Sequence, residues 1–446
     1  MRITNLLIKK IFKLSFLIFI LIELILTSCE KQAGKKPEIS IACSYSPVDV
    51  GCQIIKKSVE NFQKMHPEIK VTAYWISKDY DTKLLTMISA GTSPDIFRVN
   101  PNWVPEFVSK GILLPLDNYV KKSKIFKLSD FFPVLIHKYR FDGKFIGKGP
   151  VYGFGTDWSP DFTMIYNKTM FKKEGIPLPE NSYSWKEFLE VAKKLTKRNQ
   201  NGQIIQFGCL YPDIELLVLQ NNGKIYSEDG EKCLFDSKEA IEAIQFCIDL
   251  VNKYRVSPSN TELQNQDSGT MFRTGKIGMF FSGRYYTAIL QSMIKDFEWG
   301  VAPCIHNKKR ANIVAGPYGW VVSSKTKHHE EVWKLFEYFV VGDGVKELAK
   351  TGYNIPALQS IAYSDAFLSN PNHPKGMNKV FLDESRYAVP MALSPYVPRR
   401  YHDNVVTTEM DFGFLGKKTA EEVGKSIAKK INEKIREKLA AQNKNK

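Results

Sequence analysis

Apolar and polar residues along the first part of the chain follow patterns that predict strands and helices in turn. Glu38–Cys43 is a short apolar run typical of a buried strand, and Gly51–His66 carries apolar residues at helical spacing. Ile69–Trp75 alternates like a strand, Asp79–Ala90 again has a helical pattern, and Asp95–Val99 is a further strand. This β-α-β-α-β order predicts a parallel sheet with helices packed on its faces.

A glycine-rich stretch at residues 143–155 separates this region from a second alternating one. There, Ser184 and Glu187 form the capping box of a helix, and Asp236–Asn252 has the stripe of an amphipathic helix. A second break follows at residues 315–319. Two α/β regions separated by Gly and Pro breaks predict two lobes with a cleft between them, and ligands of such sheets bind at the carboxyl ends of the strands.

The N-terminus has the pattern of a bacterial lipoprotein signal. A basic start precedes an apolar run at residues 14–26, which is too short to span a bilayer stably. The run ends in Leu-Thr-Ser before Cys29, an arrangement in which the cysteine is diacylated and becomes the first residue. We therefore expect residues 1–28 to be a signal peptide, Cys29 to carry lipid, and residues 29–37 to form a polar tether. An ordinary secretory signal followed by a chance cysteine is the alternative.

The chain is basic, with 63 Lys and Arg against 47 Asp and Glu and a net charge of +16. Removal of residues 1–28, which hold four Lys or Arg and one Glu, lowers this charge to +13. The basic residues are scattered and mostly lysine, and the chain has no helix-turn-helix, zinc-finger or ribonucleoprotein motif. We therefore expect a solvated basic surface and no nucleic-acid partner; a site biased toward anions, or contact with acidic lipid headgroups, is the alternative.

Motifs for metal binding and catalysis are missing from the sequence. The six cysteines after Cys29 form no Cys-x-x-Cys pair, and Cys43 and Cys247 stand at apolar positions, so buried small hydrophobes are their expected role. The chain has no Gly-x-Ser-x-Gly elbow, Walker loop or His-Glu-x-x-His motif. Asp157 and Asp161 could serve glycoside hydrolysis, but such acid pairs are common by chance. We expect a protein that is not an enzyme and that uses neither a cofactor nor a metal.

Seven short segments stand in an order that points to one family. The most recognisable is Ile88–Phe97, and the others are Phe62–Val71, Gly111–Asp117, Asp142–Lys144 with Tyr152–Gly153, Ile165–Lys168 with Phe171, Phe272–Met279, and Gly319–Trp320 ahead of Ser324–Thr326. From about Pro37 onward the chain thus resembles the extracellular solute-binding proteins of carbohydrate ABC importers, the maltose-binding-like family. One departure is Gly147–Pro150, which interrupts the family's usual approach to its hinge.

The resemblance implies the two-lobe periplasmic-binding-protein fold (type II), an α/β fold whose lobes are joined by hinge strands. It implies a first lobe of residues 38–152 with 314–354 and a second lobe of residues 153–313 with 355–446. It further implies that a solute, expected to be a mono- or oligosaccharide, enters the cleft and that the lobes close on it. The closed form then docks on the transmembrane subunits of an ABC permease. We expect a monomer in the cell envelope, held by its lipid on the outside of the cytoplasmic membrane.

A sugar presents apolar C–H faces and a rim of hydroxyls, so its site needs aromatic rings and a few polar side chains. Such residues follow predicted strands or flank the expected hinges. The ligand-binding candidates are Tyr45, Arg98, Asn100, Asp157, Trp158, Tyr211, Asp213, Arg284, Tyr285, Trp320, Tyr353 and Tyr396.

The identity of the solute stays open in the sequence. Members of the family carry an aromatic residue where Arg284 and Tyr285 stand, and an arginine there would suit a carboxylated or phosphorylated sugar. Alternatives are another solute in the same fold, such as a glycerol phosphodiester, a polyamine or a metal chelate, and a lipoprotein enzyme that acts on polysaccharide.

Overall fold

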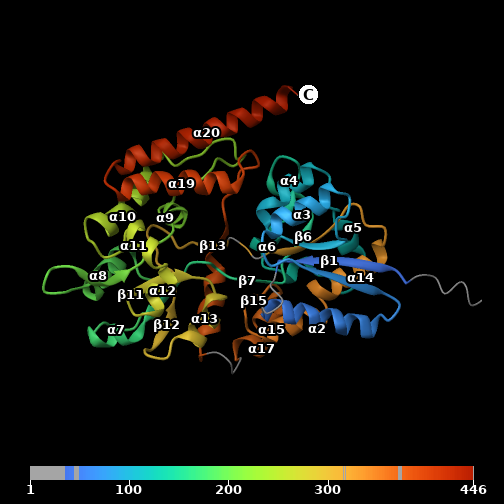
Figure 1. Ribbon diagram of the computed structural model, residues 1–446, viewed down its shortest axis with the longest axis horizontal. Coiled ribbons are helices and arrows are strands. Elements are labelled where there is room, and N and C mark those ends of the chain that lie inside the picture. Colours follow the sequence, from blue (N-terminus) through green and yellow to red (C-terminus); the bar gives the residue numbers. More distant parts are fainter. Residues whose placement is uncertain (1–35, 45–49, 315, 317, 370–373, 445–446) are drawn as a thin grey trace, which may run out of the picture.

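Two mixed five-stranded sheets organise the computed structural model, which describes residues 36–44, 50–314, 316, 318–369 and 374–444 (Figure 1). Each sheet lies at the centre of one lobe, with helices on both of its faces. The first sheet has the strand order β2-β1-β3-β14-β6, and the second has the order β12-β8-β11-β10-β9. The predicted two-lobe α/β architecture is thus confirmed.

The first lobe begins with the predicted β-α-β-α-β unit. Strand β1 pairs in parallel with β2, from Glu38 opposite Lys70 to Cys43 opposite Trp75, and with β3, whereas β14 runs antiparallel to both β3 and β6. The elements of this part are β1 (Glu38–Cys43), α2 (Val50–Met65), β2 (Lys70–Trp75), α3 (Tyr80–Ser89), β3 (Ile96–Val99), α4 (Val104–Ser109), α5 (Asp117–Lys122), α6 (Pro133–His137), β4 (Arg140–Phe141), β5 (Ile146–Val151), β6 (Gly153–Phe154), β14 (Gly319–Val322), α14 (His329–Val340) and α15 (Asp343–Lys350).

The second lobe contains the parallel pair β10 and β11 and three antiparallel neighbours. Helices α19 and α20 lie side by side along its outer edge (Figure 1). Its elements are β8 (Thr163–Asn167), α7 (Lys168–Lys173), α8 (Trp185–Leu195), β9 (Lys197–Arg198), β10 (Ile204–Cys209), α9 (Ile214–Gln220), α10 (Lys238–Asn252), α11 (Asn260–Asn265), α12 (Ser268–Arg273), β11 (Ile277–Ser282), α13 (Tyr286–Met293), β12 (Trp299–Ala302), α19 (Arg399–Phe414) and α20 (Ala420–Lys444).

Short paired strands connect the lobes. Strand β7 (Asp157–Trp158) pairs with β15 (Ile355–Pro356), and β13 (Asn312–Val314) pairs with β16 (Ala388–Pro390). Figure 1 places β7, β13 and β15 between the two lobes. The last crossing therefore runs through β16 (Ala388–Pro390), later in the chain than the lobe boundary expected after residue 354.

Residues 355–384 pack differently from the sequence expectation. They form β15 and the helices α16 (Gln359–Ala362), α17 (Asp365–Leu368) and α18 (Met377–Glu384). Ile355, Leu358, Phe367 and Phe381 are buried in the hydrophobic core of the first lobe rather than in that of the second. Sequence pattern cannot assign such short helices to a lobe, because their apolar faces would fit either core. The other limits of the two lobes stay a prediction.

Local features that the sequence indicates are present in the structure. The Ser184 hydroxyl accepts a hydrogen bond from Glu187 N at 3.2 Å, and the Glu187 carboxylate accepts from Ser184 N at 2.7 Å, which completes the predicted capping box of α8. The turn before Gly230 is closed by a hydrogen bond from Gly230 N to Ser227 O at 2.9 Å. The six cysteines that the structure describes are buried, as expected of most of them, and they are free thiols, a state that the sequence left open: Cys43, Cys52, Cys209, Cys233, Cys247 and Cys304.

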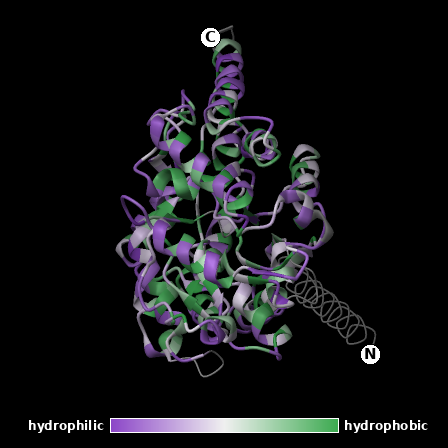
Figure 2. Ribbon diagram, turned by 90° about the vertical axis from the view of Figure 1, so that its left-hand side faces the viewer, coloured by the Kyte–Doolittle hydropathy of each residue, from purple (hydrophilic) through white to green (hydrophobic). Residues whose placement is uncertain are grey.

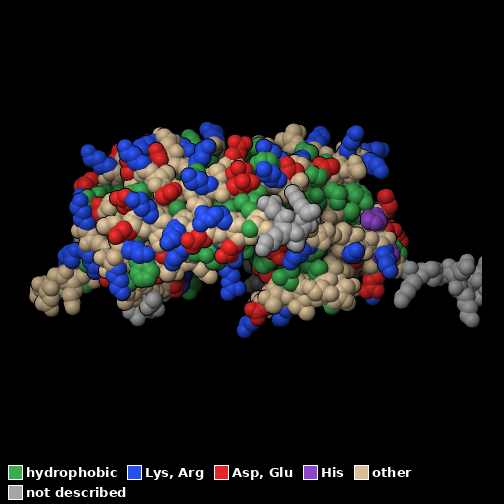
Figure 3. Space-filling model, turned by 90° about the horizontal axis from the view of Figure 1, so that it is seen from above, with side chains coloured by type: hydrophobic (Ala, Val, Ile, Leu, Met, Phe, Trp, Pro, Cys, Tyr) green, Lys and Arg blue, Asp and Glu red, His purple; other side chains and the backbone are tan. Residues whose placement is uncertain are grey.

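The surface shows how the basic charge is distributed. On the face seen in Figure 3, Lys and Arg side chains are spread widely and mixed with Asp and Glu. In Figure 2 the end of the chain, in α20, is largely hydrophilic. Among the described residues, no helix combines the length and the apolar character needed to cross a membrane.

Candidate functional site

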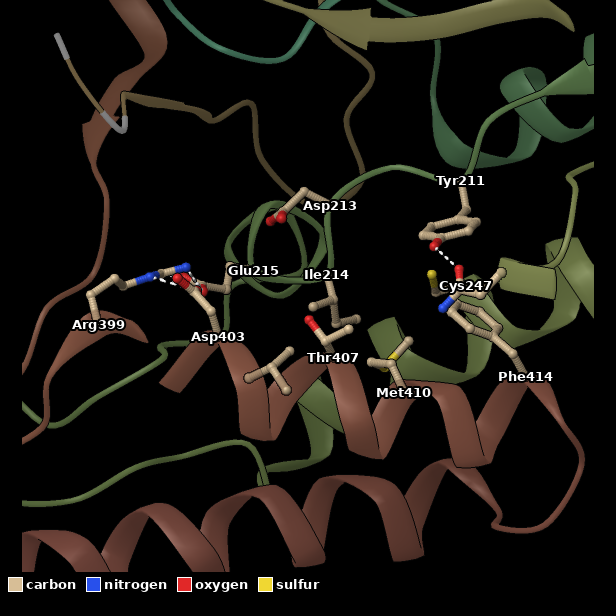
Figure 4. Close-up of a pocket in the computed structure, with 12 residues that line it drawn as sticks. Tyr211, Asp213, Ile214, Glu215, Cys247, Arg399, Asp403, Thr407, Met410 and Phe414 are labelled. Carbon is tan, nitrogen blue, oxygen red and sulfur yellow. Dashed lines mark hydrogen bonds and ion pairs between the residues drawn. The ribbon is translucent and has the colours of Figure 1, made fainter. Parts of the chain in front are cut away.

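A pocket of about 170 Å³ opens beyond the carboxyl end of β10, between α9 and α19 (Figure 4). Strand β10 delivers Tyr211 and Asp213 to it, helix α9 adds Ile214 and Glu215, and α19 closes the other side. Its lining residues are Tyr211, Asp213, Ile214, Glu215, Cys247, Asn260, Arg399, Asp403, Val406, Thr407, Met410 and Phe414. The pocket lies where ligands of such sheets are expected to bind.

One side of the pocket is charged and tightly hydrogen-bonded. Arg399 donates to both oxygens of Glu215, at 2.6 and 3.1 Å, and to Asp403 at 2.7 Å. His402 lies between Glu215, at 3.0 Å, and the hydroxyl of Tyr226, at 2.6 Å. Burial alone raises the pKa of Glu215, but the Arg399 charge and the His402 contact outweigh it and lower this pKa to about 2. Glu215 is therefore an ionised, fully partnered anchor for Arg399.

The carboxylate of Asp213 can accept further hydrogen bonds. It caps α9 by accepting a hydrogen bond from Leu216 N at 3.0 Å. Burial and the neighbouring Glu215 charge raise the pKa of Asp213 to about 6. No Lys, Arg or His nitrogen of the described residues lies within 4.0 Å of its oxygens. Asp213 can thus accept hydrogen bonds from a solute near neutral pH.

The opposite end of the pocket is aromatic. The Tyr211 hydroxyl donates to Asn260 at 2.5 Å, and the Tyr211 ring lies 4.8 Å from that of Phe414, centroid to centroid. Figure 4 shows Tyr211 and Phe414 at one end of the pocket and the Arg399 cluster at the other. A ring-shaped solute can contact the aromatic faces there while its polar groups reach Asp213.

Glu215, His402 and Asp403 are close enough together to hold a metal ion, with ligand atoms within 4.8 Å of one another. Both carboxylates are engaged by Arg399, and both ring nitrogens of His402 have partners. A guanidinium already supplies the positive charge that a metal would bring, so the donor set does not fit a metal.

A second hollow, of about 390 Å³, lies between the lobes. The β4–β5 hairpin of the first lobe lines one side of it, and residues 224–230 and 390–395 line the other. Two ion pairs cross this gap: Lys144 to Glu231 at 3.6 Å and Lys148 to Glu228 at 3.9 Å. Exposed side chains therefore bridge the lobes at this hollow.

The structure brings only some of the candidate residues together. Tyr211 and Asp213 share the pocket at β10. Arg98, Asp157 and Trp320 surround a separate hollow of about 30 Å³ in the first lobe. Arg98 donates to Tyr318 O at 2.6 Å, and Asp157 accepts from Asn354 at 2.8 Å. These three residues hold the strand ends near the crossings in place.

Other candidates, and the ring of Trp320 as well, have structural partners within the protein. Trp158 is 0% exposed in the first core, and the Trp320 ring stacks on Phe339 at 4.8 Å. Asn100 caps a short 3-10 helix, Tyr353 is half-buried, and Tyr396 is buried in the second core with its hydroxyl 3.3 Å from Glu231. Tyr45 and Cys29 lie outside the described residues. Contact of any of these residues with a solute stays a prediction.

The adjacent candidates Arg284 and Tyr285 have opposite environments. Arg284 is 0% exposed, and its side chain donates to Asn378 at 2.9 Å and to Thr287. Burial lowers its pKa to about 10. Tyr285, by contrast, is 38% exposed at the end of β11. Tyr285 is therefore available to a solute in this arrangement, and Arg284 is not.

Sequence reasoning missed the α19 side of the pocket. Arg399, Asp403 and Thr407 recur at every fourth position, so they lie on one face of the helix. That spacing in a polar helix after the Pro-rich segment was the available signal. It did not show which element this face opposes.

Comparison with known proteins agrees with the fold. Residues 53–341 match the family described as bacterial extracellular solute-binding protein. A putative binding protein of Brucella abortus is 26% identical over 298 residues, which cover 65% of this chain and 68% of that protein.

Two solved structures show the same architecture. The ABC substrate-binding protein from Listeria monocytogenes in complex with cycloalternan has a TM-score of 0.75 and 24% identity, covering 90% of this chain and 99% of that one. The sugar-binding protein from the phytopathogen Xanthomonas citri has a TM-score of 0.77 and 17% identity, covering 91% and 99%. With its two lobes and its pocket at a strand end, this chain belongs to the bacterial extracellular solute-binding proteins, which bind solutes and are not enzymes.

Proposed function

We propose that the chain is the solute-binding component of an ABC importer and that it captures a mono- or oligosaccharide. The observation that carries this proposal is the pocket at β10, which combines aromatic rings with carboxylates in the second lobe. The resemblance to structures whose names refer to sugar or cycloalternan binding supports it.

The pocket chemistry suits a polyhydroxylated ring. Tyr211 and Phe414 offer apolar faces, and Asp213 and Thr407 offer polar atoms to hydroxyls. The partly exposed ring of Tyr285 adds a further surface beyond β11. Closure of the lobes would bring the β4–β5 hairpin over the solute and exclude water from it.

The charges of the pocket favour an uncharged saccharide over an anionic one. An anionic solute was suggested by the basic composition and by Arg284, but Arg284 is buried against Asn378 and Thr287. The pocket itself contains Asp213, Glu215 and Asp403 against Arg399 alone. A carboxylated or phosphorylated sugar would meet excess negative charge there.

The proposed setting follows from the role in transport. The lipid at Cys29 would hold the protein on the outer side of the cytoplasmic membrane as a monomer. The loaded, closed form would then dock on the transmembrane subunits of the permease. Tethering raises the effective concentration of the binder at the permease.

Thermal unfolding in the presence of a solute panel tests the proposal. A mono- or oligosaccharide at 100 times its Kd should stabilise the folded protein by about 2.7 kcal/mol and raise its Tm. Tyr211→Ala and Asp213→Ala should reduce the shift, while Tyr363→Ala, at an exposed site away from the pocket, should preserve it. A shift caused by another solute class, with none from any saccharide in the panel, would overturn the proposal.

A further inference from the structure

A lysine-rich segment at the far end of the first lobe stands apart from the scattered charge elsewhere. Four exposed lysines, Lys121, Lys122, Lys124 and Lys127, fall within seven residues at the end of α5 and in the loop after it. Among them is Ile125, whose side chain is 53% exposed. Exposed lysines around an exposed apolar residue suit an interface that is both anionic and partly apolar.

These lysines have no acidic partner. Within the described part of the chain, no carboxylate oxygen lies within 4.0 Å of any of the four ammonium groups, whereas Lys110 is paired with Glu106 at 2.6 Å. Two acids beside the segment have other partners: Glu337 accepts from Ser123, and Asp130 accepts from Ser360 at 2.5 Å. The positive charge of the segment is therefore free to meet an external anion.

The loop is fixed on the core, so its outward residues are presented in a defined way. Phe126 is buried and packs against Trp333 of α14, with ring centroids 5.7 Å apart. The Ser123 hydroxyl accepts from Phe126 N at 2.9 Å. Ile125, one residue earlier, consequently points to solvent.

A hollow of about 480 Å³ adjoins the segment. Ile125 and Lys127 form part of its lining, together with Lys346, Leu358, Ile361 and one acid, Asp130, which is hydrogen-bonded to Ser360. Apolar and basic side chains thus share one concave surface, as a lipid headgroup with the start of its acyl chains would require.

The segment lies near the point at which the chain leads to its expected lipid. Strand β1 begins at the same end of the lobe as α5 and α14 (Figure 1). Lys36 donates to Pro67 O at 2.8 Å, and the next residue, Glu68, interacts electrostatically with Lys334 of α14. Cys29 and Lys36 are seven positions apart in the sequence, a span of at most about 25 Å. A lipid on Cys29 therefore keeps this end of the protein close to the bilayer.

We propose that the Lys121–Lys127 segment docks on an anionic phospholipid surface beside the lipid anchor. The end of the first lobe that lies far from the cleft then contacts the membrane. The acyl chains supply the affinity, and the lysines set the orientation of the protein. Each lysine near such a surface contributes roughly a fivefold preference for the docked state. This inference depends on the predicted anchor and is independent of which solute is bound.

The test uses the lipidated protein in vesicles of phosphatidylcholine, with or without phosphatidylglycerol. Ile125→Cys is labelled with a polarity-sensitive fluorophore; the six described native thiols are buried and do not compete. Met293→Cys, a 60% exposed site on α13 of the second lobe, carries the same label as a control. We expect the label at 125 to shift to the blue and to lose at least half of its quenching by aqueous iodide, only with phosphatidylglycerol. High salt should reverse this effect.

Two triple variants with the same change in charge distinguish an effect of this segment from an effect of net charge. Lys121→Glu, Lys122→Glu and Lys124→Glu together should abolish the shift, whereas Lys186→Glu, Lys193→Glu and Lys194→Glu on α8 should preserve it. Lys122→Glu alone serves if the triple variant unfolds, and should weaken docking roughly fivefold. Equal iodide quenching at position 125 in both vesicle types overturns the proposal, as does equal loss in both triple variants.

Failure of the anchor has its own signature. A protein that does not float with phosphatidylcholine vesicles lacks the lipid, because the lysines do not contribute to binding of these vesicles. The chain from residue 30 onward is then sedimented with phosphatidylglycerol vesicles, and the two triple variants are compared. Binding lost only on reversal at 121–124 supports the docking surface, and equal binding of both variants refutes it.

Discussion

At the scale of single residues, Asp213 is the group whose ionisation should control binding. Its pKa is raised to about 6 by burial and by the Glu215 charge. Above that pH the carboxylate accepts hydrogen bonds from solute hydroxyls, and below it the protonated group loses this capacity. Solute affinity should therefore fall about tenfold between pH 7.5 and pH 5, as measured by calorimetry. Asp213→Asn should have a flat profile, and the exposed Asp365→Asn should retain the wild-type one.

The same shift predicts an effect on stability without solute. Because the folded-state pKa lies above the unfolded value of about 3.9, the stabilising contribution of protonated Asp213 is present below pH 4. It is lost as the pH rises through 6. Asp213→Asn, which keeps the helix cap, should unfold with a free energy about 1 kcal/mol higher than the wild type at pH 8 and equal to it at pH 4. Equal urea midpoints at both pH values would contradict the assigned environment.

At the scale of elements, the sequence was most informative where the determining contacts are local. The Ser184–Glu187 capping box and the alternation in Ile69–Trp75 each depend on residues a few positions apart, and both elements formed as predicted. The pocket depends on the contact between Glu215 and Arg399, which are 184 positions apart, and a local sequence pattern cannot predict such a contact. Trp158 and Trp320 illustrate the same limit, because an aromatic ring suits a core as well as a sugar.

The contact between α8 and β10 shows how closely neighbouring elements approach. A Cβ atom added at Gly208 would lie 1.9 Å from the carbonyl oxygen of Ala192, so only glycine fits there. Gly208→Ala should lower the free energy of unfolding by about 3 kcal/mol in urea titrations, because helix and strand must move apart. At Gly316 the nearest heavy atom would be 3.9 Å away, and Gly316→Ala should change stability little. Equal stability of the two variants would show that α8 shifts freely.

At the scale of the whole molecule, the lobes are connected by short strand pairs, by buried contacts such as Arg284–Asn378, and by exposed ion pairs across the cleft. The pairs Lys144–Glu231 and Lys148–Glu228 are solvent-exposed, so each contributes at most about 1 kcal/mol to the observed arrangement. The double variant Lys144→Glu/Lys148→Glu should open the lobes, raise the radius of gyration in X-ray scattering and weaken solute binding two- to fivefold. Lys172→Glu, which breaks a pair within the second lobe, is the control. An unchanged radius and affinity in the double variant would show that closure is governed elsewhere.

The order of strands in the first sheet affects how the protein can be made. Strand β14 inserts between β3 and β6, although the whole second sheet is encoded between β6 and β14. During synthesis the first lobe therefore lacks an inner strand until Gly319–Val322 has emerged. Closing so long a loop is entropically slow, so the growing chain stays unfinished for most of its synthesis. Because its first sheet is completed this late, the chain stays unfolded for longer. A secretion machinery therefore has time to carry it across a membrane before it folds.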